Sequence, residues 1–173
     1  NGYPRRPMHA LPPPLGWPRL STALYCENPR AAIRFYCEAF GFAVRLWIDD
    51  AGTASREVPE GDGPVEHSEL TVGDGVHVAL IMVSASRKAG PEWGYRRAPR
   101  EFAGSGAPIN TQSLMLYVDD VDAHFAQAKR AGATIVSEPK TTDYGEGFWI
   151  DRGYEVADPE GHHFWFYQRL QTR

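Results

Sequence analysis

Two stretches of the chain carry the apolar spacing of an amphipathic helix. The first has its apolar residues at positions i, i+3, i+4 and i+7, namely Ile33, Tyr36, Cys37 and Phe40. Asn28 followed by Pro29 is typical of a helix start, because asparagine caps free N–H groups and proline fits the first turn. Gly41 suits the left-handed conformation that ends many helices. The pattern predicts a helix that begins after Asn28 and ends at Phe40.

The second stretch has the same design. Its apolar positions are Val121, Phe125 and Ala128. Asp119-Asp120 comes directly before them and supplies a carboxylate cap, while Gly132 follows as the stop. A second helix is therefore expected between Asp120 and Gly132.

Short runs of β-branched, aromatic and aliphatic residues predict strands around the two helices. The expected strands span residues 20–26, 43–48, 65–72, 76–83, 114–118, 133–136, 153–157 and 162–168. Gly73-Asp74-Gly75 separates the third and fourth of these strands, and Asp158-Pro159-Glu160-Gly161 separates the last two. Both sequences are typical of tight turns, so each pair of strands is predicted to form a hairpin.

The order of strand, helix and three strands occurs twice, and residues of the two copies correspond. The aligned pairs are Leu24 with Leu116, Ala31 with Ala123, Glu69 with Glu155, Gly75 with Gly161, and His77 with His163. The repeat predicts an α+β fold of two tandem βαβββ modules with mixed sheets. The predicted divisions are a proline-rich arm at 1–18, a first module at 19–83, an inter-module loop at 84–111 and a second module at 112–173.

The arm and the loop differ in composition from the modules. Six prolines before residue 19 exclude a helix or a central strand there, and Trp17 is the residue expected to anchor the arm. The loop carries a basic cluster of Arg87, Lys88, Arg96, Arg97 and Arg100. Long loops are often functional, so a protein-interaction role based on these two segments stays open beside a solvated linker.

Charge and composition narrow the classes of function. The chain has 18 Lys and Arg against 22 Asp and Glu, a formal net charge of −4, which argues against a general nucleic-acid binder. No segment approaches the roughly 20 apolar residues of a membrane span, so a cytoplasmic protein is expected. Cys26 and Cys37 lack the spacing of zinc or redox sites and are expected to be buried hydrophobes.

Three segments resemble the glyoxalase/bleomycin resistance/dioxygenase superfamily, also called the vicinal oxygen chelate (VOC) superfamily. They are NPRAAIRFYCEAFGF at 28–42, LYVDDVDAHFAQAKRAGATIVSEP at 116–139 and DPEGHHFWFYQ at 158–168. The resemblance extends from about Leu20 to Tyr167. It implies sheets curled around a cavity, helices on their outer faces and a homodimer. It does not imply one activity, because this superfamily contains enzymes as well as drug-binding proteins.

The resemblance also implies where a metal ion would bind. In the metal-dependent members, ligands come from the first and last strands of each module, at positions that here hold Ser21, Ala79, Ser113 and Trp165. None of these four side chains is a competent ligand for a divalent ion, and tryptophan fills the space that an ion and its waters need. We therefore expect no metal and no other cofactor, and a metal enzyme would need non-standard ligands.

Alternation along the predicted strands sorts side chains between the two faces of each sheet. With three-residue loops, Glu69 is expected opposite Ala79, and Glu155 opposite Trp165. Val78, Leu80 and Met82 then lie under the helices. The other face lines the cavity, where ligand-binding residues are expected to be Ser21, Tyr25, His77, Ser113, Met115, Tyr117, Trp149, His163 and Trp165.

Several cavity residues have more than one interpretation. Glu155 and Glu69 are candidates for a catalytic base or a hydrogen-bond acceptor, and are alternatively surface carboxylates at a sheet edge. His77 and His163 are either ligand-binding or structural histidines. His67, Glu69 and His77 together offer a non-standard metal site.

The sequence favours a bleomycin resistance-like protein that binds a small, partly aromatic or apolar organic molecule without a metal ion. Sequestration of that molecule is one purpose. The alternative is a lyase, isomerase or epimerase that uses Glu155 or Glu69 as the base.

Overall fold

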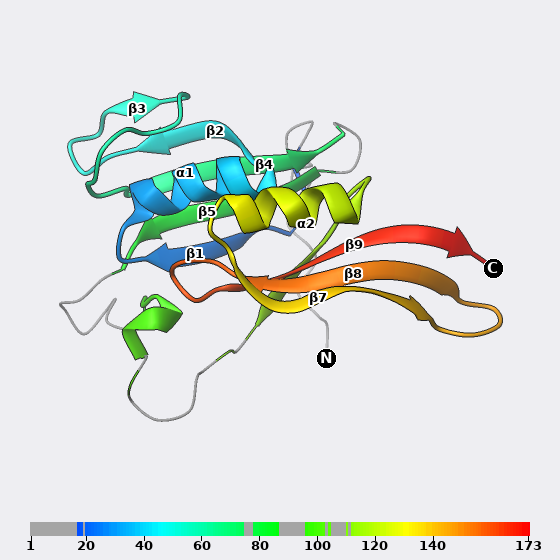
Figure 1. Cartoon of the computed structure of the whole chain (residues 1–173). Coiled ribbons are helices and arrows are strands. Elements are labelled where there is room, and N and C mark those ends of the chain that lie inside the picture. Colours follow the sequence, from blue (N-terminus) through cyan, green and yellow to red (C-terminus); the bar gives the residue numbers. More distant parts are fainter. Residues whose placement is uncertain are drawn as a thin grey trace, which may run out of the picture.

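Two mixed β-sheets, each accompanied by one helix, make up the structure (Figure 1). The computed structural model describes residues 17, 18, 20–74, 78–86, 96–102, 104, 110 and 112–173. Most of the predicted arm, His77 and the basic residues Arg87 and Lys88 lie outside the described residues. No helix in the described part of the chain is long and apolar enough to cross a bilayer.

The first sheet follows the predicted βαβββ order with one addition. Its strands are β1 (Thr22–Cys26), β2 (Ala43–Ile48), β3 (Ala54–Ser55), β4 (His67–Gly73) and β5 (Val78–Ala85). They are arranged in the order β1-β5-β4-β2-β3, with β1 parallel to β5 and the other neighbours antiparallel. The short strand β3 was not predicted, because two residues are too few for a visible pattern.

The second sheet repeats this arrangement. Its strands are β6 (Ser113–Tyr117), β7 (Thr134–Asp143), β8 (Trp149–Ala157) and β9 (His163–Thr172), in the order β6-β9-β8-β7. A short 3-10 helix, η1 (Pro99–Phe102), precedes it. The predicted strands 133–136, 153–157 and 162–168 were too short, since β7, β8 and β9 continue beyond the N-terminal end of α2 (Val121–Arg130) (Figure 1).

Both predicted helices are confirmed with their caps. Helix α1 (Pro29–Phe40) begins where the Asn28 side chain accepts a hydrogen bond from Ala31 N at 3.1 Å. It ends at Gly41, whose φ of 72° places it in the left-handed region that glycine adopts without strain. Helix α2 begins where Asp120 accepts from Ala123 N at 2.9 Å.

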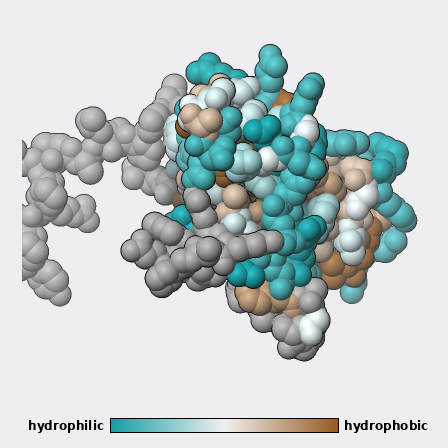
Figure 2. Space-filling view, turned by 90° about the vertical axis from the view of Figure 1, so that its left-hand side faces the viewer, coloured by the Kyte–Doolittle hydropathy of each residue, from teal (hydrophilic) through white to brown (hydrophobic). Residues whose placement is uncertain are grey.

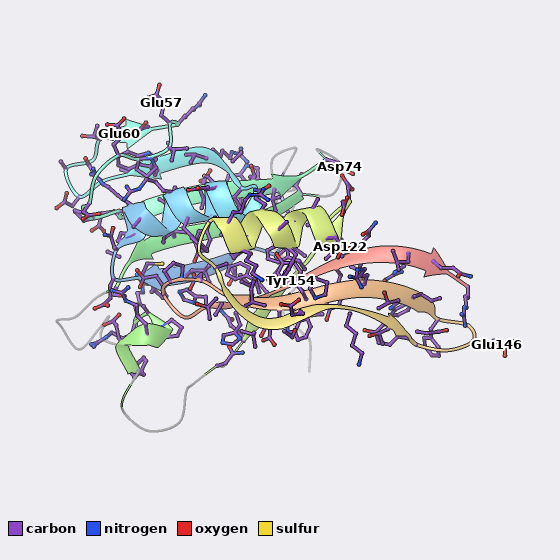
Figure 3. All side chains as sticks on the ribbon, viewed as in Figure 1. Glu57, Glu60, Asp74, Asp122, Glu146 and Tyr154 are labelled. Carbon is purple, nitrogen blue, oxygen red and sulfur yellow. The ribbon has the colours of Figure 1, made fainter. Side chains whose placement is uncertain are left out.

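The two helices pack on each other and on one face of the sheets, here called the helix face (Figure 1). The core between them is aromatic. Its largest fully buried side chains include Tyr36, Phe40, Tyr154, Phe164 and Phe166. Tyr154 lies beneath α2 (Figure 3). Such side chains each bury on the order of 150–250 Å² and dominate the hydrophobic stabilisation.

Of the two cysteines that were predicted to be buried, Cys26 is buried and Cys37 is only partly buried. The end of the molecule to the left in Figure 1 is mostly hydrophilic, with hydrophobic side chains in separate patches (Figure 2). Cys26 is fully buried in the core, and this burial raises the pKa of its thiol. Cys26 is therefore an inert hydrophobe, as predicted.

The register of the first hairpin differs from the prediction. Leu70 pairs with Ile81 and Val72 with Ala79, so Glu69 does not oppose Ala79. Because Leu70 and Ile81 both belong to the core, Ala79 and Ile81 lie on the helix face. The predicted placement of Val78, Leu80 and Met82 under the helices is therefore wrong, and these three side chains point to the opposite face, here called the far face.

The register of the second hairpin is confirmed. Glu155 pairs with Trp165, and Val156 pairs with Phe164. The Asp158–Gly161 turn closes with a hydrogen bond from Gly161 N to Asp158 O at 3.1 Å, as its sequence predicts. Phe164 and Phe166 lie on the helix face, which leaves Trp165 and Tyr167 on the far face.

The Asp158–Gly161 turn also joins the two modules. Glu160 is 3% exposed, and its carboxylate accepts hydrogen bonds from Glu27 N at 2.9 Å and Asn28 N at 3.0 Å. Tyr36 donates its hydroxyl hydrogen to Asp158. Residues of the second module thus satisfy backbone groups at the start of α1 in the first.

His124 of α2 lies in the aromatic core and is expected to make stability depend on pH. Its ring lies 4.2 Å from that of Phe166, and its Nδ1 shares a 2.7 Å hydrogen bond with the Tyr154 hydroxyl. Burial lowers the pKa of His124 from 6.5. Between the two pKa values, His124 is therefore protonated in the unfolded chain and neutral in the folded chain. Its contribution to the free energy of unfolding is complete above pH 6.5 and is lost as the pH falls through the lowered pKa.

Urea unfolding at several pH values between 7.5 and 5 measures this effect. We expect the unfolding free energy of wild-type protein to fall more steeply with acidification than that of His124→Gln, since the other titrating groups are shared. Parallel curves for the two proteins would contradict a role of His124.

Candidate functional site

The far face of the second sheet gathers most of the predicted cavity residues. The parallel pairing of β6 with β9 sets Ser113 beside His163, Met115 beside Trp165, and Tyr117 beside Tyr167. Glu155 of β8 lies on the same face, opposite Trp165. These residues come from three adjacent strands, so the structure brings them together as the alternation predicted.

Two stacked rings form the floor of this face. The rings of Trp165 and Tyr167 lie 5.7 Å apart at an interplanar angle of 12°. Gly153 on β8 makes room for them, because a Cβ atom there would lie 2.5 Å from Tyr167 Cδ1. The glycine is therefore required by a close approach of the tyrosine ring rather than by backbone conformation.

A cavity of about 280 Å³ opens above these rings. Its walls come from β7, β8 and β9, since bulges in β7 between Ile135 and Lys140 bend that strand. The lining residues are Ser137, Glu138, Lys140, Thr142, Tyr144, Asp151, Gly153, Trp165 and Tyr167. The cavity thus combines flat aromatic surface with polar groups, the combination that fixes small organic molecules in proteins.

Glu155 and His163 form a hydrogen-bonded pair beside the rings. His163 Nδ1 lies 2.9 Å from Glu155 Oε1, and both side chains are largely buried. The backbone N–H of Glu155 donates to Ser137 Oγ at 3.0 Å, which ties β8 to the bulged β7. A carboxylate that orients an imidazole is a common arrangement for proton transfer, and it also holds a polar group for a ligand.

A second polar group on this face was not predicted from the sequence. Asp151 is buried and forms an ion pair with Arg169, and it accepts a hydrogen bond from the Tyr117 hydroxyl at 3.2 Å. Arg169 also lies over the Trp149 ring at 4.7 Å, so Trp149 contacts this group rather than the floor of the cavity. Burial, with added contributions from neighbouring groups that include Asp151, raises the pKa of Tyr167.

The predicted residues of the first module lie apart from this group. On the far face of the first sheet, Glu69 is bonded to His67 at 3.1 Å and paired with Arg45 at 3.5 Å. Tyr25 lies on β1 with Arg96 over its ring at 5.4 Å, and Ser21 directly precedes β1. His77 lies outside the described residues.

A larger cavity of about 670 Å³ lies at the junction of the two modules, between the end of α1 and the start of α2. Two of its polar lining groups, Gln168 and His124, are engaged in the fold. Gln168 accepts a hydrogen bond from Val121 N at 3.1 Å, and His124 is bonded within the core. These groups have little capacity left for a ligand, so the smaller cavity is the better candidate.

The residues present do not fit a divalent metal ion at the positions that the resemblance implies. Ser21, Ser113 and Trp165 are not ligands of the required kind, and Ala79 lies on the helix face. Elsewhere in the described residues, no three His, Cys, Asp or Glu side chains are grouped closely enough to hold an ion.

Comparison with known proteins agrees with the two-module architecture. The family model of the Glyoxalase/Bleomycin resistance protein/Dioxygenase superfamily matches residues 20–166. An uncharacterized protein of Mycobacterium bovis is 33% identical over 107 residues, which are 62% of this chain and 60% of that protein. The matched part therefore spans less than two thirds of this relative.

Solved structures with a similar fold come from several bacteria. TioX from Micromonospora sp. ML1 is 22% identical with a TM-score of 0.53, and the match covers 90% of this chain and 99% of TioX. A glyoxalase/bleomycin resistance protein/dioxygenase family enzyme from Burkholderia phytofirmans PsJN is 20% identical with a TM-score of 0.52. This match covers 87% of the present chain and 97% of the enzyme. At these identities the likeness concerns the fold alone.

Proposed function

The chain belongs to the Glyoxalase/Bleomycin resistance protein/Dioxygenase superfamily, and from this premise we propose that it binds a small organic molecule on the far face of its second sheet. The molecule is partly aromatic or apolar, and no metal ion takes part in holding it. Sequestration of such a molecule is the simplest use of this binding.

The stacked pair of Trp165 and Tyr167 carries this proposal. The two rings present a flat apolar surface at the floor of a cavity of about 280 Å³, where a planar group of the ligand can stack. The Glu155–His163 pair lies beside them and offers a hydrogen-bonding edge. Rings that bury a ligand and a few polar groups that orient it are the usual parts of such a site.

We further propose that the protein is a homodimer and that the second copy covers this face. Met115 and Tyr117 lie on β6, the outer strand of the second sheet, and are 68% and 62% exposed. Exposed apolar side chains on an edge strand are usually covered by another chain or element. Pairing of two copies would shield both the edge and the ligand.

Isothermal titration with aromatic metabolites and antibiotics tests the binding proposal. For the compounds that bind wild-type protein, we expect Trp165→Ala to weaken binding about tenfold, because the stacking surface is lost. Glu155→Gln should change binding much less, since glutamine keeps the size and one acceptor oxygen. The titrations are run with and without chelator, which should make no difference.

Two results would contradict the proposal. Unchanged affinity in Trp165→Ala would exclude the second sheet as the site. Loss of binding on chelation, together with about one divalent ion per purified chain, would indicate a metal site on the far faces of the sheets.

The Glu155–His163 hydrogen bond favours a second candidate function, an isomerase, epimerase or lyase that removes a proton from its substrate. Glu155 is then the base, acting directly or through His163, and no metal is needed. In this case Glu155→Gln abolishes turnover of a bound compound while its affinity remains. Equal effects on affinity and turnover would show that Glu155 has no separate chemical role.

A further inference from the structure

The middle of the far face of the first sheet is buried, whereas Met115 and Tyr117 on that of the second are exposed. Leu80 is 2% exposed and Glu69 is 9% exposed, although both point away from the helices. Trp17, which precedes the first strand, contributes to the cover. Its ring lies 4.4 Å from the guanidinium carbon of Arg45.

Arg45 is placed on this face by an irregularity of β2. The register of β2 against β4 shifts between Val44 and Leu46, so Arg45 is an extra residue of a bulge. Its Nε lies 3.5 Å from Glu69 Oε2, and Glu69 is bonded to His67. The Trp17 ring, the guanidinium, the carboxylate and the imidazole therefore form one connected group.

This group resembles the candidate site of the second sheet. Each far face holds a hydrogen-bonded Glu–His pair, Glu69 with His67 and Glu155 with His163. In the second sheet the neighbouring rings belong to β9 itself. In the first sheet β5 supplies the apolar side chains of Val78, Leu80 and Met82, and the ring beside the Glu–His pair comes from Trp17.

The Trp17 side chain lacks a hydrogen bond to the described residues in this position. Its indole Nε1 is buried, and no described residue accepts a hydrogen bond from it. A buried donor without a partner is unfavourable, so this tethered ring is less well bound than a free molecule that can turn its donor toward an acceptor. Leu20, three residues further on, is 85% exposed, so its side chain adds little packing near Trp17.

We propose that the far face of the first sheet is a second ligand site, which Trp17 occupies until a small molecule displaces it. The site takes an electron-rich planar aromatic molecule of the indole or phenol type. Arg45 stacks on its ring, because a guanidinium is attracted to the electron-rich face of such rings. The apparent affinity for the ligand is lowered, because only the molecules in which Trp17 has left the site can bind it.

Titration of isotope-labelled protein with indole, followed by NMR, tests this inference. Amide signals of Arg45 and Glu69 report the first sheet, and those of Trp165 report the second, so the two sites are scored separately. We expect Trp17→Ala to bind indole at the first sheet about tenfold more tightly than wild-type protein does. Trp17→Phe, which keeps a ring over Arg45, should stay close to wild type.

Trp149→Ala is the matched control, because Trp149 also stacks on an arginine, Arg169, but in the second sheet. It should leave the first-sheet affinity unchanged. In the Trp17→Ala background, Arg45→Gln should remove the gain. Equal affinity of wild type and Trp17→Ala at the first sheet, or a gain that survives Arg45→Gln, would overturn the inference, whatever happens at Trp165.

Discussion

Glu160→Ala is expected to lower the free energy of unfolding by about 3 kcal/mol, the largest effect of any single substitution considered. The carboxylate accepts hydrogen bonds from the backbone N–H groups of Glu27 and Asn28 at 2.9 and 3.0 Å, in an environment that leaves Glu160 3% exposed. Alanine leaves both donors without an acceptor. Both hydrogen bonds are partly buried, and a hydrogen bond to a charged group contributes about 1.5–3 kcal/mol.

Urea denaturation followed by circular dichroism measures this loss. Glu160→Gln keeps one acceptor oxygen and should fall between alanine and wild type. Glu146→Ala is the matched control, since Glu146 lies exposed in the turn between β7 and β8 (Figure 3) and its loss should change stability by less than about 0.5 kcal/mol. A Glu160→Ala protein as stable as the control would show that water replaces the carboxylate.

Gly153→Ala is expected to lower the free energy of unfolding by about 1–3 kcal/mol and to weaken ligand binding at the same time. The added Cβ would lie 2.5 Å from Tyr167 Cδ1 and 3.0 Å from Phe166 O, so the ring of Tyr167 has to move. Tyr167 is one of the two stacked rings of the candidate site. Calorimetric unfolding and ligand titration on the same sample measure both effects.

Combining the substitution with Tyr167→Leu tests the cause. Removal of the ring relieves the contact, so the double variant should regain stability relative to Gly153→Ala. Additive losses in the double variant would mean that the strain lies in the backbone of β8 and β9, not in the ring.

The local signals in the sequence predicted the second module better than the first. Pro159 and Gly161 define a turn of known length, and Phe164 and Phe166 alternate with polar or amphipathic neighbours, so the register of β8 and β9 was fixed. In β5 every residue from Val78 to Val83 is apolar, so no alternation marks a buried face. The sequence predicts a hairpin loop of Gly73 to Gly75, whereas in the structure β4 ends at Gly73 and β5 begins at Val78.

The candidate site was predicted only in part, for a related reason. Glu155, His163 and Trp165 follow from alternation once the hairpin is known. The ion pair of Asp151 with Arg169 depends on the part of β8 and β9 that continues past α2, where the expected strands had already ended. Arg45 reaches Glu69 only through a bulge, which a period of two residues cannot show.

The Glu160 carboxylate couples the folding of the two modules. Its hydrogen bonds to Glu27 and Asn28 join residues 133 and 132 positions apart, so these two N–H groups gain their acceptor only when nearly the whole chain is available. Contacts of such separation form late and slow folding, because a large loop must close first. We therefore expect the two modules to fold together rather than as independent copies.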